Sequence, residues 1–150
     1  MKWCYETHDG LRLIYPNAAI ASAYLHKARE ALVAMGAFVS RDWQLTAAYY
    51  AMYFGIYALL QRIGIVCRIH ACTIDYVKTF LDEFSQEEIM IVEEALHARI
   101  DAQYYTDRPV SEERVQRILR HAPEFVTRCA ILLSTMGEKR IADLRKRFPS

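Results

Sequence analysis

The hydrophobic pattern is densest between Tyr49 and Leu60, where nearly every side of a helix would be apolar. A helix on the surface of a protein keeps one polar face, so this stretch predicts the central, mostly buried helix of a helical bundle. Small residues alternate there with aromatic residues, which lets neighbouring helices approach while the rings fill the gaps. Each buried tyrosine hydroxyl needs a hydrogen-bond partner, so we expect polar side chains to reach this helix from elsewhere in the chain.

Apolar residues at helical spacing predict the helices around it. Asn17 and Ser40 are N-cap residues, Gly64 is suited to a helix C-terminus, and Ser85 with Glu88 forms a capping box. The expected helices span about residues 17–36, 40–62, 73–84, 85–105 and 111–136. The sequence therefore predicts an all-α, up-and-down bundle of four to five helices.

The two ends of the chain differ from this helical domain of residues 17–136. Residues 1–16 predict an irregular N-terminal arm with a short extended piece at residues 11–15. Residues 137–150 are basic, but Ile141, Leu144 and Phe148 are spaced three and four apart. This spacing predicts an amphipathic extension of the last helix that docks on the bundle or on a partner, and RNA binding through phosphates is the alternative.

Composition narrows the classes of function. The net charge of +1 favours neither nucleic acid nor a membrane as a partner of the whole domain, and no apolar run reaches the roughly 18 residues of a membrane span. We expect a cytoplasmic protein whose four cysteines are reduced.

A sulfur-rich corner raises a metal hypothesis. Cys67, His70 and Cys72 are suitable zinc ligands, but they supply only three ligands and zinc usually binds four. Free cysteines are also among the most buried residues, so ordinary packing is favoured here and no metal or other cofactor is expected.

Four segments, in order, carry a resemblance to a known family. Residues 47–53 read Ala-Ala-Tyr-Tyr-Ala-Met-Tyr, residues 58–64 form an apolar half-helix and a glycine turn before His70, and residues 99–104 read Arg-Ile-Asp-Ala-Gln-Tyr. Residues 23–32 form a similar lead-in helix. Together they resemble the HEPN superfamily, and within it a prokaryotic and archaeal, largely uncharacterised branch with a Tyr-Tyr-Ala-Met-Tyr helix. The resemblance covers about residues 18–133.

The resemblance implies an up-and-down helical bundle that forms a homodimer. Many relatives bind a minimal nucleotidyltransferase encoded beside them. Others are ribonucleases, often toxins, that cleave RNA without a metal through an arginine and a histidine separated by four to six residues.

The ribonuclease signature is degenerate in this chain. Four residues separate Arg99 from Tyr104, which stands where the ribonucleases have histidine. A tyrosine with a pKa of about 10 is a poor general base at neutral pH. Arg114 and His121 enclose six residues but lie in the last helix, where this branch would not place the motif, and seven residues separate Arg62 from His70.

Two interpretations of the polar residues remain open. Tyrosine, histidine and arginine side chains can satisfy one another in a buried network, or they can line a cleft for an anionic ligand or an RNA phosphate. The candidate residues are Tyr49, Tyr50, Tyr53, His70, Arg99, Asp101 and Tyr104. We favour a non-catalytic interaction module, the partner of a nucleotidyltransferase in a two-component, toxin–antitoxin-like system. The alternative is a metal-independent ribonuclease that acts at a dimeric cleft and uses Arg99 and His70.

Overall fold

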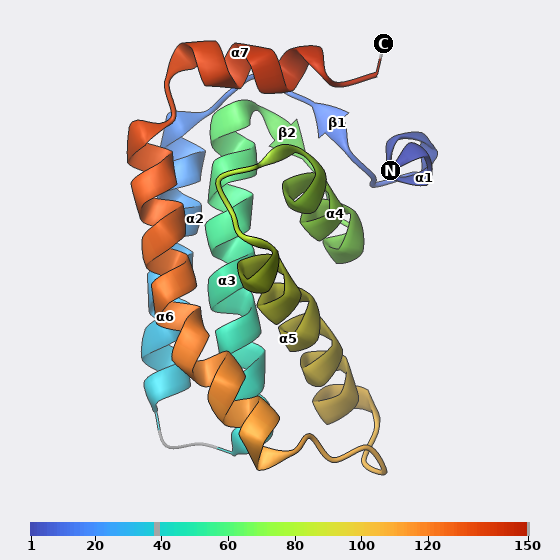
Figure 1. Cartoon of the computed structure of the whole chain (residues 1–150), viewed down its shortest axis with the longest axis vertical. Coiled ribbons are helices and arrows are strands. Elements are labelled where there is room, and N and C mark those ends of the chain that lie inside the picture. Colours follow the sequence, from blue (N-terminus) through green and yellow to red (C-terminus); the bar gives the residue numbers. More distant parts are fainter. Residues whose placement is uncertain (38–39, 150) are drawn as a thin grey trace.

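The computed structural model describes residues 1–37 and 40–149, which form seven helices and one two-stranded ribbon (Figure 1). The helices are α1 Lys2–Glu6, α2 Ala18–Gly36, α3 Arg41–Ile63, α4 His70–Phe80, α5 Gln86–Tyr104, α6 Glu112–Thr135 and α7 Glu138–Lys146. The strands are β1 Arg12–Leu13 and β2 Ile65–Val66. The all-α class is confirmed. The expected four to five helices were too few, because α1 and α7 form at the two ends.

Helix α3 is the centre of the molecule, with α2, α5 and α6 around it (Figure 1). Helices α3 and α6 run in one direction along the bundle, and α2 and α5 run in the other. Tyr49, Met52 and Leu60 on α3 are fully buried, as the apolar pattern predicts. Gly55 allows α6 to approach closely, because a Cβ atom there would lie 3.0 Å from the Sγ of Cys129.

The C-terminal end of α3 is closed by a side chain from the other end of the sequence. Gly64 has a φ of +85°, the left-handed conformation that glycine adopts without strain. One guanidinium nitrogen of Arg145 on α7 donates to the carbonyl oxygens of Ile14, Ile63 and Gly64, at 2.8, 2.9 and 3.0 Å. Arg145 thus gives a charged donor to the carbonyl group of Ile63, which the helix end leaves without a partner, and also to those of Ile14 and Gly64.

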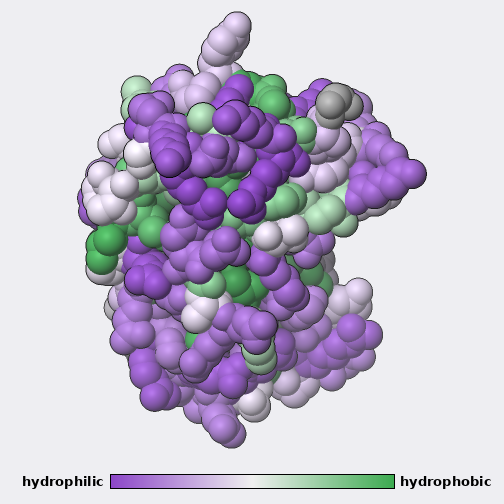
Figure 2. Space-filling view, turned by 45° about the horizontal axis from the view of Figure 1, so that its top comes forward, coloured by the Kyte–Doolittle hydropathy of each residue, from purple (hydrophilic) through white to green (hydrophobic). Residues whose placement is uncertain are grey.

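The C-terminal residues do not continue α6. The chain turns at Met136 and Gly137, and α7 crosses the end of the bundle as a separate helix (Figure 1). Ile141 and Leu144 are buried, so the predicted docking on the bundle is confirmed, whereas a continuous last helix was wrong. The outer face around α7 is mostly hydrophilic (Figure 2).

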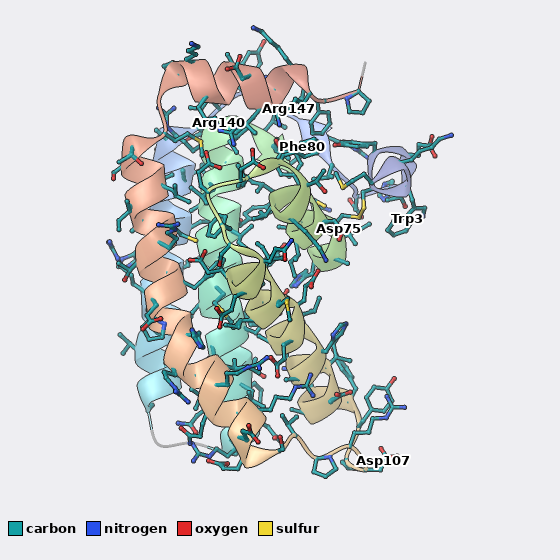
Figure 3. All side chains as sticks on the ribbon, viewed as in Figure 1. Trp3, Asp75, Phe80, Asp107, Arg140 and Arg147 are labelled. Carbon is teal, nitrogen blue, oxygen red and sulfur yellow. A yellow bond between two sulfur atoms is a disulfide. The ribbon has the colours of Figure 1, made fainter. Side chains whose placement is uncertain are left out.

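A second arginine of α7 also has a structural role. Arg140 donates to both carboxylate oxygens of Glu83, at 2.8 and 2.9 Å, and to the carbonyl oxygen of Phe80 at 3.0 Å (Figure 3). The Arg140 hydrogen bonds lower the pKa of the Glu83 carboxyl group. Arg145 and Arg140 both donate hydrogen bonds within the protein, so these two cations of the basic C-terminal segment are directed toward the protein rather than toward an RNA.

Helix α4 is displaced from its expected position at residues 73–84. It begins at His70, where Thr73 donates its hydroxyl to the carbonyl oxygen of Ile69, and it ends at Phe80, because Leu81 leaves the helical conformation. The supposed corner around residues 67–72 therefore contains the first turn of a helix. This shift places His70 on a helix rather than in a loop.

The N-terminal arm is more ordered than the sequence pattern indicates. Strand β1 pairs antiparallel with β2, and Leu11 is buried. Cys4 on α1 forms a disulfide with Cys72 on α4, so the expectation of reduced thiols is wrong for this pair. Cys67 and Cys129 are free and buried. Among the helices within residues 1–37 and 40–149, none is long and apolar enough to cross a membrane.

Candidate functional site

Three helices bring together a cluster of aromatic and basic side chains, which we call the His70 cluster: Tyr49, Tyr50, Tyr53, His70 and Arg99. The tyrosines come from α3, where positions four apart lie on one face. His70 is the first residue of α4, and Arg99 comes from the C-terminal half of α5. The cluster therefore joins three elements that are far apart in the sequence.

His70 is held on two sides. The Tyr49 hydroxyl lies 2.6 Å from its Nδ1 atom, and the Tyr53 ring stacks on the imidazole with a centroid distance of 4.1 Å and an interplanar angle of 8°. Burial raises the pKa of Tyr49, so its hydroxyl stays protonated and can donate to Nδ1. In the tautomer in which Nδ1 accepts this bond, neutral His70 carries its proton on Nε2.

Arg99 lies over two tyrosine rings. Its Cζ atom is 5.3 Å from the centroid of Tyr49 and 5.0 Å from that of Tyr50, which are cation–π distances. Its Nε atom is buried and has no hydrogen-bond partner in the part of the chain that the structure describes. Burial, and then the charge of Arg99, lower the pKa of His70. The imidazole is therefore neutral at pH 7, and Arg99 is the cation of the cluster.

Comparison with known families assigns the fold. The model of the HEPN domain matches residues 18–132, about three quarters of the chain. The chain belongs to the HEPN domain family. No curated protein matches it. The matched part of this HEPN protein contains the whole His70 cluster, whereas Cys4 and helix α7 lie outside it.

Two of the predicted site residues lie outside the His70 cluster of this HEPN domain. Asp101 faces Arg114, 3.8 Å away, and Arg108, 4.0 Å away. Tyr104 is the last residue of α5, and 70% of its surface is exposed. Tyr104 is therefore no member of a buried network. The five-residue spacing from Arg99 also places the two side chains on different sides of the helix.

The other arginine–histidine pairs of the sequence do not form a joint site in the HEPN domain. Arg114 is paired with Glu94 on α5, and His121 lies 3.6 Å from Glu124 on its own helix. Arg62 is paired with Glu138 at the start of α7, which directs it away from His70. Each arginine thus has a carboxylate partner within the protein.

The metal hypothesis for Cys67, His70 and Cys72 is not supported by the geometry. Cys72 is bonded to Cys4, and the Cys67 thiol donates to the carbonyl oxygen of Ile69. Among residues 1–37 and 40–149, no group of three or more histidine, cysteine, aspartate and glutamate side chains could hold a metal ion.

One member of the site was missed by the sequence analysis. Thr73 is fully buried. Burial raises the pKa of Tyr53, and the nearby Thr73 side chain offsets part of that rise. Thr73 follows His70 by three residues and so shares its face of α4. The sequence pattern predicted that this helix begins at residue 73 rather than at His70, so it did not indicate that Thr73 and His70 share a helix face.

Proposed function

We propose that this HEPN protein is a non-catalytic interaction module and that its partner is a minimal nucleotidyltransferase, in a two-component, toxin–antitoxin-like system. In this proposal it belongs to the branch with the Tyr-Tyr-Ala-Met-Tyr helix and acts as a homodimer. Its mechanism is recognition by helix faces. The observation that carries the proposal is the packing of His70 against Tyr49 and Tyr53.

This packing is better suited to fixing helices than to acid–base catalysis. A ribonuclease that works without a metal needs groups that take up and release protons during the reaction. Here Nδ1 of His70 is already occupied by the Tyr49 hydroxyl, and the residue in the second signature position is the exposed Tyr104. Large exposed apolar side chains, such as Trp43 on α3 and Met90 on α5, are available for contact with another protein.

A second candidate function, metal-independent RNA cleavage, has one observation in its favour. The Nε atom of Arg99 lacks a partner among the described residues, and a guanidinium is the side chain best suited to a phosphate. Neutral His70 beside it could accept a proton through Nε2 in the tautomer in which Nδ1 donates to the Tyr49 hydroxyl. This reading requires RNA to reach a cluster in which Tyr49 is fully buried.

Co-expression tests the preferred function. The test requires that a minimal nucleotidyltransferase is encoded beside this chain; the two proteins are then produced together, and the mixture is studied by size-exclusion chromatography with light scattering. The proposal predicts a stable complex of defined stoichiometry, and a homodimer when the HEPN protein is alone at micromolar concentration. A strict monomer would contradict the dimer, and separate elution of the two proteins would contradict the partnership.

A further inference from the structure

A hollow lies between the start of α3 and the end of α5, at the opposite end of the bundle from α7. Its volume is about 390 Å³, within the range of small-molecule and side-chain sites. Trp43 and Tyr104 line it, with 60% and 70% of their surfaces exposed, and Asp42, Thr46 and Gln103 line it as well. Single exposed apolar residues are common, but two large aromatic rings from different helices at one hollow are typical of a binding site.

The floor of the hollow is held by a chain of hydrogen bonds. Gln103 donates to the Thr46 hydroxyl at 3.3 Å, and this hydroxyl donates to the backbone oxygen of Asp42 at 2.9 Å. These bonds tie the last turn of α5 to the first turns of α3. The aromatic walls are therefore carried by two helices whose relative position is fixed, which reduces the ordering cost of binding.

The charges around the hollow favour a cation. The Asp42 side chain has no ion pair within residues 1–37 and 40–149, and the last turn of α5 contains no basic residue to balance its partial negative charge. The N-terminus of α3 acts in the opposite direction, and the Ser40 hydroxyl accepts from one of its free amide groups, that of Trp43. The faces of Trp43 and Tyr104 add negative potential.

The neighbouring ring shows how this end of the protein accommodates a cation. The guanidinium carbon of Arg108 lies 4.1 Å from the centroid of Tyr105, the residue that follows α5. Neither Trp43 nor Tyr104 has such a cation over its ring in the described part of the chain. The two rings at the hollow thus offer an aromatic face to a cation, as Tyr105 does, but no arginine or lysine of the described residues lies over them.

We propose that the hollow binds an arginine side chain presented by a protein partner, with the guanidinium between Trp43 and Tyr104 and its charge facing Asp42. A planar guanidinium stacks on aromatic rings and donates to a carboxylate in a way that a compact ammonium does not. The inference rests on the proposed role in protein binding, since it names the chemistry by which a partner is recognised. The site itself can be tested without any partner.

The tryptophan in the hollow serves as the reporter. The chain has two tryptophans, and the Trp3→Phe variant leaves Trp43 as the only one. N-acetyl-arginine amide is titrated into this variant, with the neutral isostere N-acetyl-citrulline amide as the matched ligand. We expect a saturable change in Trp43 emission with arginine, at a dissociation constant on the order of 1 mM, and none with citrulline.

Variants of the walls locate the site. Asp42→Asn and Tyr104→Ala, each in the Trp3→Phe background and checked for folding by circular dichroism, should weaken arginine binding by roughly fivefold or more. Tyr105→Ala, which removes a ring outside the hollow, should leave it unchanged.

Three results of the titrations would overturn the proposal: no saturable change, equal binding of citrulline, or equal binding by the Asp42→Asn and Tyr104→Ala variants. A change in Trp43 emission on raising the protein concentration alone would assign the hollow to a second copy of the chain, and would also overturn it. Failure of the arginine titration together with a stable nucleotidyltransferase complex would reject this site while leaving the proposed function intact.

Discussion

The hydroxyl of Tyr49 lies 2.6 Å from Nδ1 of His70 and links the buried centre of α3 to the first residue of α4. Tyr49 is fully buried, so its hydroxyl would be costly without this partner. The histidine in turn lies under the Tyr53 ring and close to Arg99 on α5. The hydrogen bond therefore fixes the relative positions of the helices that surround the site.

Removal of this hydroxyl should destabilise the protein. Tyr49→Phe leaves Nδ1 of His70 without its hydrogen-bond partner in a partly buried place, and we expect the free energy of unfolding to fall by about 1–2 kcal/mol. Tyr50→Phe is the matched control, since the Tyr50 hydroxyl makes no hydrogen bond to the described residues. Urea unfolding measures both variants. Equal effects of the two changes would show that the hydrogen bond contributes nothing specific.

Stability should decrease on mild acidification because of His70. Burial and Arg99 lower the pKa of His70 in the folded protein. Below its ordinary pKa of about 6.5 the unfolded chain binds a proton that the folded protein does not, so stability is lost as the pH falls from about 6.5 toward the lowered pKa.

His70→Gln should flatten this part of the stability profile, as measured by thermal unfolding between about pH 7 and pH 5. His97→Gln removes an exposed histidine outside the cluster and should retain the wild-type slope. An unchanged slope in His70→Gln would show that another group causes the acid sensitivity.

Arg145 should be among the most important residues for stability on the surface helix α7. Arg145→Ala leaves the carbonyl oxygens of Ile14, Ile63 and Gly64 without their charged donor, and we expect a loss of about 3 kcal/mol. Lys146→Ala next to it removes an exposed cation and should change stability by less than about 0.5 kcal/mol. Denaturant unfolding of the two variants gives the comparison, and similar losses in both would contradict the capping role.

The disulfide between Cys4 and Cys72 should contribute strongly because it closes a long loop. The sequence separation of 68 residues corresponds to about 4 kcal/mol of loop entropy in the unfolded chain. Cys4→Ser combined with Cys72→Ser should lose stability of this order. Reductant should lower the melting temperature of the wild type and leave that of the double variant unchanged; a wild type insensitive to reductant would contradict the bond.

The hydrophobic pattern was sufficient to predict the helices of the bundle and the residues that begin and end them. Asn17, Ser40, Ser85 and Gly64 occupy the capping positions that their chemistry indicates. These features depend on local interactions. The start of α4 was misplaced because no side chain caps it: Ile69 stands at the N-cap, and the Thr73 hydroxyl bonds back to its carbonyl oxygen.

The features that escaped prediction depend on contacts between distant residues. The Cys4–Cys72 bond and the three hydrogen bonds of Arg145 join parts of the chain that composition and spacing cannot relate. At the site, Tyr49, His70 and Arg99 meet as the resemblance suggests, but Tyr104 faces solvent, because its position on α5 points away from Arg99. The segment from Arg99 to Tyr104 is contiguous in the sequence, but in the structure its first residue lies in the His70 cluster and its last residue faces solvent.

The most direct test of the account is an RNA-cleavage assay in EDTA. Wild type is compared with Arg99→Ala and His70→Ala, and with Arg114→Ala and His121→Ala for the other arginine–histidine pair, after circular dichroism has confirmed folding. The account predicts no cleavage above the buffer control by wild type or any variant. EDTA-resistant cleavage by wild type that disappears in a folded variant of either pair would contradict it and establish the protein as a ribonuclease.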